Sequence, residues 1–137
     1  MWWIYALLSA FFAALTAIFA KMGIRNMDSN LATAIRTVVI LMLAWGIVLF
    51  KGSASGIGNL SKQNWIFLLL SGCATGLSWI FYFKALQLGE VSQVAPVDKL
   101  SVAIAIVLAV IFLGEPITWK SAVGALMIMG GTFVLIL

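Results

Sequence analysis

Five long apolar runs constrain this chain more than any other feature of its sequence. The fourth run holds two charged residues, and each of the others holds one or none. A helix rises about 1.5 Å per residue, so about 20 apolar residues cross a hydrocarbon core of about 30 Å. We therefore predict five transmembrane helices, at residues 2–20, 31–50, 65–86, 91–113 and 117–137.

The composition agrees with this prediction. Only 9% of the 137 residues are charged, whereas a soluble domain carries roughly 25%, so charges are too few to cover a soluble surface. We predict an all-α, multi-pass protein of the cell membrane, with one transmembrane domain over residues 1–137 and no soluble domain. The first run lacks the basic start and the A-x-A site of a signal peptide, so we expect a membrane helix there.

Several chemistries find no support in the sequence. There is no histidine, and Cys73 is the single cysteine, so we predict no disulfide, metal site or cofactor. We also find no nucleophile–base pair, and we predict that the protein is not an enzyme. The net charge is +4, but the bases lie between apolar runs, where they set topology and meet lipid headgroups rather than nucleic acid.

The breaks between the runs carry turn and capping residues. Asp28 and its polar neighbours supply N-cap chemistry before the second run. Residues 52–59 read as a flexible loop by composition. Gly114-Glu115-Pro116 is predicted to stop the fourth helix and start the fifth, because proline suits a first helical turn.

Small residues recur at helical spacing in three runs, and such stripes let membrane helices approach closely. They are interpreted either as packing surfaces within the chain or as a subunit interface, for which the last run is the first choice. The stripes are Ala6, Ala10, Ala13, Ala17 and Ala20; Gly72 and Gly76; and Gly124 and Gly131.

A hydroxyl stripe on the third run has two interpretations. Ser71, Thr75, Ser78 and Tyr82 are spaced by four, three and four residues, which places them on one helical face. They form either the polar wall of a solute cavity, with Trp79 or Tyr82 as an aromatic contact, or hydroxyls bonded back to carbonyls or neighbouring helices.

Charges inside the second and fourth runs are more informative. Arg36 and Asp98 reach similar depth, and a charge inside a span usually faces protein or water. They form either a structural pair, coupled directly or through water, or a substrate or proton site. Lys84 and Lys99 are long enough to reach the headgroups instead.

Pro96 lies two residues before Asp98 and removes one backbone donor. The carbonyl that it frees must find another partner in a membrane. Either it kinks the helix at the mouth of a cavity, or it is a simple first-turn proline.

The segment YFKALQLGEVSQVAPVDKLS (residues 82–101) resembles the EamA-like family of the drug/metabolite transporter superfamily. FLGEP (residues 112–116), the glycines of residues 124–132 and Arg36 share this resemblance. It implies one five-helix repeat of a ten-helix inverted-repeat fold, with a central cavity lined largely by the first, third and fourth helices. The small multidrug exporters of this superfamily use a glutamate in the first helix, but residues 2–20 hold no acid.

These observations predict a secondary transporter for small metabolites or amphipathic compounds that works as a homodimer by alternating access. The Lys/Arg count is three on the N-terminal face and five on the other, and it becomes three on each if Lys84 and Lys99 serve the cavity region. A small bias permits insertion both ways, so an antiparallel homodimer is expected; the alternatives are a parallel homodimer, a heteromer or a monomer. The alternative is a non-transporting membrane subunit, or a lipid-linked-sugar flippase component, within a larger complex. The predicted partners are membrane lipid, a small-molecule substrate and a second copy. The candidate substrate-binding residues are Arg36, Ser71, Thr75, Ser78, Trp79, Tyr82, Asp98, Lys99 and Ser101.

Overall fold

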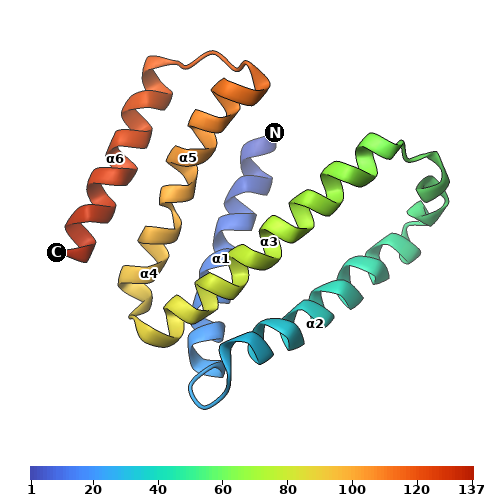
Figure 1. The fold of residues 1–137 in the computed structure, drawn as a ribbon, viewed down its shortest axis with the longest axis horizontal. Helices are drawn as coiled ribbons and strands as arrows, with labels where there is room; N and C mark the ends of the chain where they lie inside the picture. The colour runs from blue at the N-terminus through green and yellow to red at the C-terminus, as the bar shows by residue number, and fades with distance from the viewer. The chain divides into compact units, whose positions relative to one another are not determined.

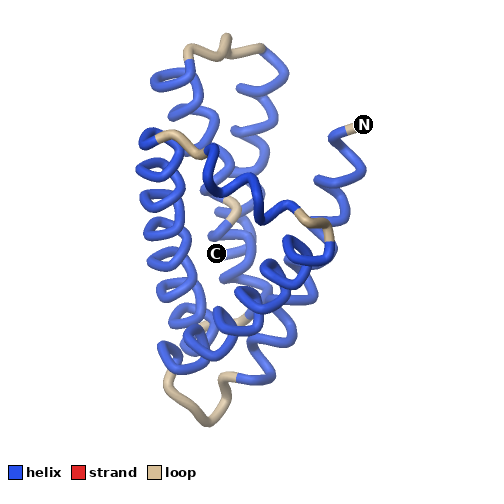
Figure 2. The backbone as a smooth tube through the Cα atoms, turned by 90° about the vertical axis from the view of Figure 1, so that its right-hand side faces the viewer, coloured by secondary structure: helices blue, strands red, loops and turns tan.

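The computed structural model describes all 137 residues, and its elements are all helical (Figures 1 and 2). Five spans are long and apolar enough to cross a membrane, which confirms the predicted fold class. The fourth span, Val91–Leu113, consists of three consecutive helical pieces. In chain order the elements are α1 (Trp2–Gly23), α2 (Ser29–Phe50), η1 (Ser53–Asn59), α3 (Lys62–Leu88), α4 (Val91–Asp98), α5 (Leu100–Leu108), the π-helical turn η2 (Ala109–Leu113) and α6 (Trp119–Ile136).

The helices fall into two compact units. One unit contains Met1–Lys21 and Leu88–Leu137, and the other contains Met22–Gln87. Within the first unit, α4 and α5 pack along α6 (Figure 1). Within the second unit, η1 connects α2 to α3. The organisation as one transmembrane domain stays a prediction.

A side-chain cap fixes where α2 begins. The Asp28 carboxylate accepts hydrogen bonds from the backbone N–H groups of Asn30 and Leu31, at 2.9 and 3.0 Å, and so caps α2. These bonds satisfy donors that have no partner within the helix. The prediction of N-cap chemistry before the second span is confirmed at Asp28.

Two connections differ from the predictions. The stretch expected to be a flexible loop contains the 3₁₀ helix η1, entered through Gly52 in the left-handed conformation at φ 66°. Pro116 does not start the last helix, because Thr118 takes the N-cap position and its hydroxyl accepts the N–H of Ser121 at 3.1 Å. Pro116 therefore lies in the connection before α6.

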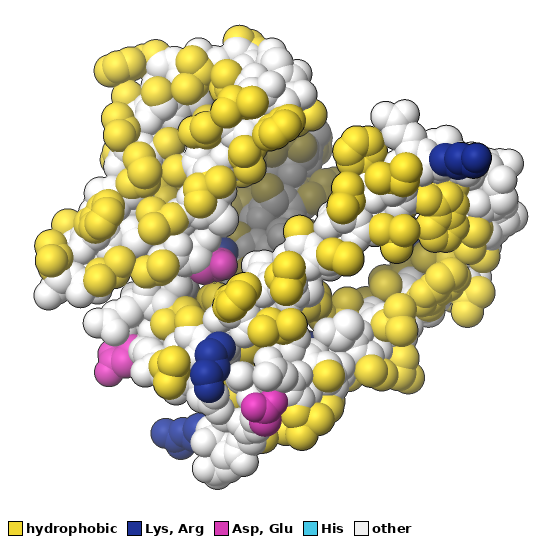
Figure 3. Space-filling model, in the orientation of Figure 1, with side chains coloured by type: hydrophobic (Ala, Val, Ile, Leu, Met, Phe, Trp, Pro, Cys, Tyr) yellow, Lys and Arg dark blue, Asp and Glu magenta, His cyan; other side chains and the backbone are white.

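Few side chains are buried within this chain. The buried apolar residues are Ala17, Ala20, Ile24, Phe83 and Leu86. Large apolar side chains on every span are exposed, and they cover much of the face drawn in Figure 3. Such a surface suits contact with lipid tails or with other membrane helices rather than with water.

Candidate functional site

Arg36 lies on α2 against two aromatic rings of α3. The guanidinium carbon is 4.4 Å from the centre of the Trp79 ring and 5.1 Å from the centre of the Phe83 ring. Trp79 and Phe83 are four residues apart, so they share one face of α3. The structure thus brings together two predicted site residues, Arg36 and Trp79, in a cation–π arrangement.

Phe83 is a partner that the sequence analysis missed. Its side chain is buried, with 2% of its surface exposed. The four-residue spacing from Trp79 was the available signal. The run of apolar residues around it, however, makes one phenylalanine hard to distinguish from a lipid-facing neighbour.

The hydroxyl stripe lies on the same helix and is mostly exposed. Ser71, Thr75 and Ser78 are exposed, and Tyr82 is half-buried with its ring 6.4 Å from that of Phe83. The Thr75 hydroxyl donates to the Ser71 carbonyl at 2.9 Å, which is the back-bonded arrangement. A role for this stripe in binding solute stays a prediction.

The fourth span is broken beside its two charges. Pro96 is the sixth residue of α4, beyond its first turn, and it has no N–H to donate to the Ser92 carbonyl. The Lys99 N–H bonds the carbonyls of Ala95 and Pro96, at 3.3 and 3.0 Å, which tightens the turn where α4 ends. A new helix, α5, then begins at Leu100.

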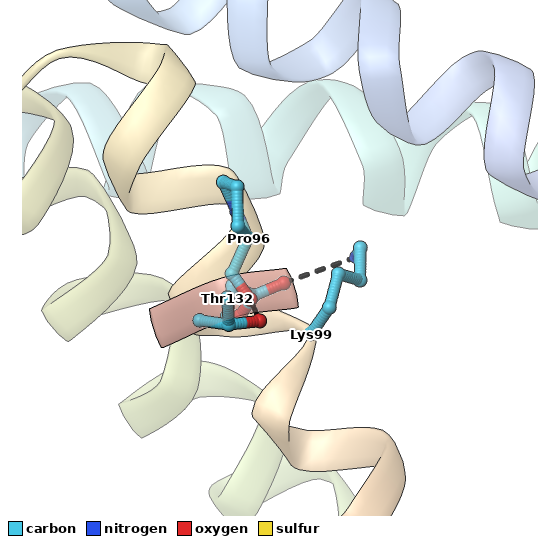
Figure 4. A network of polar contacts seen from close by, with 4 residues as sticks. Pro96, Lys99 and Thr132 are labelled. Atoms are coloured by element: carbon cyan, nitrogen blue, oxygen red, sulfur yellow. Dashed lines mark hydrogen bonds and ion pairs between the residues drawn. The ribbon is translucent and has the colours of Figure 1, made fainter. Parts of the chain in front are cut away.

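Thr132 of α6 forms a hydrogen bond with the backbone at this turn (Figure 4). Its hydroxyl lies 3.2 Å from the Pro96 carbonyl and 2.8 Å from the Ile128 carbonyl in its own helix. Thr132 is buried, with 3% of its surface exposed. In the sequence, Thr132 is distinguished only as part of the glycine-bearing last span, because its bond to α4 forms between two packed helices.

Asp98 and Lys99 form an ion pair at this break, with 3.1 Å between the carboxylate and the ammonium. The Asp98 side chain is 34% exposed and that of Lys99 is 56% exposed. Ser101, the second residue of α5, is exposed. Arg36 and Asp98 belong to different units, and their coupling stays a prediction.

Polar side chains also form hydrogen bonds near the ends of the spans. Lys84 donates to the side-chain oxygen of Gln87 at 3.3 Å, and the Gln87 amide donates to the Met27 carbonyl at 2.9 Å. In the other unit, the Lys21 ammonium donates to the Gly89 carbonyl at 2.7 Å. The bonds of Gln87 and Lys21 satisfy backbone carbonyls in the turns that follow α1 and α3.

A cavity of about 360 Å³ lies between α5, η2 and α6. Its lining is mainly apolar, with Glu115 and Ser121 as its polar members. This cavity was not predicted from the sequence, because Glu115 was interpreted only as part of a turn. The lining residues are Val102, Ala105, Ile106, Ala109, Val110, Glu115, Pro116, Ile117 and Ser121.

The glycines of the predicted packing faces are open. A methyl group built on any of them would meet no atom of the chain within 4 Å, apart from its own immediate surroundings. The structure therefore does not show these faces packed within the chain. The glycines concerned are Gly72, Gly76, Gly124 and Gly131.

A helical membrane protein with a broken fourth span and an arginine inside its second matches a known transporter family. The model of the EamA-like transporter family matches residues 1–137. The chain belongs to this family and is a membrane transporter, as the resemblance predicted. Membership of a transporter family also points away from an enzyme.

Among curated proteins, an uncharacterized transporter in the cobO 3′ region of Sinorhizobium sp. is 46% identical over 134 residues. The match covers 98% of this chain and 95% of that protein. GDP-fucose transporter 1 of Dictyostelium discoideum is 29% identical over 95% of this chain. The uncharacterized transporter YxxF of Bacillus subtilis is 29% identical over 93% of this chain. The chain spans 37% and 40% of the last two proteins. No solved structure matches.

Proposed function

We propose that this chain is one half of a secondary transporter in the cell membrane that moves a small solute by alternating access between two antiparallel copies. The observation that carries this proposal is the pattern of matched lengths. A relative of nearly the same length aligns end to end, and two longer relatives align over about two fifths of their length. The longer relatives have room for two such units, and a second copy supplies the equivalent of the other unit here.

The exposed surface supports a paired form. The open glycines Gly72 and Gly76 on α3, and Gly124 and Gly131 on α6, let another helix approach closely. Two oppositely oriented copies recreate an inverted repeat, an arrangement that places the solute site at the repeat interface.

The broken fourth span supports the transport step. Transporters use discontinuous helices whose freed backbone groups line the solute site near the middle of the bilayer. The break at Lys99 lies beside the Asp98–Lys99 ion pair, and Thr132 engages the Pro96 carbonyl. One relative is named for a small polar solute, GDP-fucose. We propose small metabolites or amphipathic compounds as the class of solute that this chain transports.

The test uses the purified full chain in lipid vesicles, with single solutes from neutral, cationic and anionic classes. The proposal expects one solute to raise the thermal stability of the protein in detergent and to accumulate in protein-bearing vesicles but not in empty ones. Cross-linking in native membranes provides the competing outcome. Capture of a larger membrane protein, with no response to any solute and no uptake, would overturn the proposal in favour of an accessory subunit or flippase component.

A further inference from the structure

The Arg36 side chain has a strong requirement for a negative partner. It is the eighth residue of α2, about 10 Å along the helix axis from its start. A charged group inside a span costs a few kcal/mol on insertion scales unless protein, water or a ligand compensates it. Arg36 is also half-buried, which limits its access to the surroundings.

Within its own unit, Arg36 is held by rings and not by a carboxylate. Trp79 and Phe83 lie 4.4 and 5.1 Å from its guanidinium carbon. Asp28 is the single acid among residues 22–87, and its carboxylate bonds the backbone at the start of α2. In the other unit, the carboxylate of Asp98 already contacts Lys99 at 3.1 Å.

The chemistry of the guanidinium identifies the missing partner. A guanidinium stacked against aromatic rings keeps its N–H edge free, and this rigid fork matches a carboxylate or a phosphate in two parallel hydrogen bonds. Trp79 and Phe83 both belong to α3, so they occupy only the side of the guanidinium that faces this helix.

We infer that Arg36, positioned by Trp79 and Phe83, is a binding site for the oxyanion group of a solute, a carboxylate or a phosphate. This inference rests on the proposed transport function and names the class of its substrate. Trp79 and Phe83 act as positioning residues, while Arg36 makes the contact with the anion. The same chemistry would recognise the phosphate of a lipid headgroup, so the test separates the two sources.

Arg36 can be probed selectively with an arginine reagent, because Arg25 is the only other arginine in the chain. In an Arg25→Lys background, the neutral arginine reagent phenylglyoxal reports on Arg36 alone, and mass spectrometry measures the modification rate. The protein is held in a maltoside detergent free of phospholipid. Sodium benzoate and sodium phosphate are each compared with sodium chloride at equal ionic strength, and benzamide serves as the neutral counterpart of benzoate.

We expect benzoate or phosphate to slow modification about ten-fold when present at about ten times its dissociation constant. Benzamide and chloride should leave the rate unchanged. Trp79→Ala should weaken the protection, and the matched control Trp65→Ala, near the other end of α3, should retain it. Protection by added phospholipid without any effect of soluble oxyanions would overturn the inference in favour of a headgroup site, and equal rates in all solutions would also overturn it.

These outcomes are separable from those of the transport test. Uptake of a neutral or cationic solute, together with no protection by oxyanions, would overturn the anion site and leave the transporter proposal standing. Protection without uptake of any solute would support the anion site and count against transport.

Discussion

A single hydroxyl joins two helices of the first unit. Thr132 divides its one donor between the Pro96 carbonyl of α4 and the Ile128 carbonyl of its own helix. The Pro96 carbonyl also accepts the Lys99 N–H at 3.0 Å, so the Thr132 hydroxyl is a second donor to it, supplied by another helix. In a membrane, no bulk water competes for such a bond. The bond is therefore expected to stabilise the packing of α4 on α6.

Thr132→Val keeps the shape of the side chain and removes the hydroxyl. The expected loss of stability is about 1 kcal/mol, the usual size of a hydrogen bond between membrane helices. Reversible unfolding in mixed micelles measures it. The matched control is Thr75→Val, because the Thr75 hydroxyl bonds only the Ser71 carbonyl in its own helix. Equal effects of the two substitutions would show that the contact with α4 contributes nothing.

The hydroxyl stripe of α3 leads to a prediction about which single residues water can reach. If Ser71, Thr75, Ser78 and Tyr82 line a solute path, cysteines placed there in a Cys73→Ala background should react with a water-soluble thiol reagent in native membranes. Water reaches the wall of a solute path but not the hydrocarbon, so cysteines at the lipid-facing controls Leu69 and Ile80 should stay unlabelled. Negligible labelling of both sets would assign the stripe to helix packing.

At the scale of helices, the sequence predicts the regular elements but only part of what interrupts them. An interruption at Pro96 was one of two interpretations, whereas the 3₁₀ helix η1 and the π-helical turn η2 were not predicted. The five spans follow from hydropathy because the bilayer sets their length. Asp28 follows from local capping chemistry. The position of Pro116 was predicted wrongly because proline fits both a first turn and a connection, and the Thr118–Ser121 bonds decide between them.

The candidate site was predictable only where one helix carries the pattern. Trp79 and the hydroxyl stripe follow from spacing along α3, and Arg36 follows from its charge within an apolar run. The contact of Arg36 with Phe83, and that of Thr132 with Pro96, each join two helices. Sequence spacing gives the face of one helix but not which residue of another helix lies opposite it.

Gly114 ends the fourth span in a conformation that disfavours other residues. Its φ is +67°, in the left-handed region, and no neighbouring atom would obstruct a side chain there. Gly114→Ala should therefore cost about 1 kcal/mol from backbone strain alone. Thermal unfolding measures this cost against Gly58→Ala, where φ is not in that region and space is equally open. No difference between the variants would show that the turn adapts.

The whole chain exposes apolar side chains along every span, so its stability as a unit depends on lipid or on another copy. An antiparallel pair is possible only if the chain inserts in both orientations. Orientation follows the bias of Lys and Arg near the span ends. Five spans place Lys51, Lys62 and Lys120 on the face of the N-terminus.

The opposite face has five basic residues: Lys21, Arg25, Arg36, Lys84 and Lys99. Four of them have partners within the chain: Lys21 with the Gly89 carbonyl, Arg36 with the rings of Trp79 and Phe83, Lys84 with Gln87, and Lys99 with Asp98. If Lys84 and Lys99 serve the cavity region rather than act as topology signals, three bases remain on each face. A balance this close permits insertion both ways.

Orientation is measured with two separate reporters fused to the C-terminus. Each reporter is active on one side of the membrane only. We expect comparable signals from both. Adding two lysines to the η1 connection should shift the ratio strongly toward one orientation and reduce solute uptake, because oppositely oriented partners become scarce. Co-expression with a copy locked in the other orientation should restore uptake. A signal from one side only, in a chain that still transports as a purified single polypeptide, would exclude the antiparallel dimer and leave a parallel one.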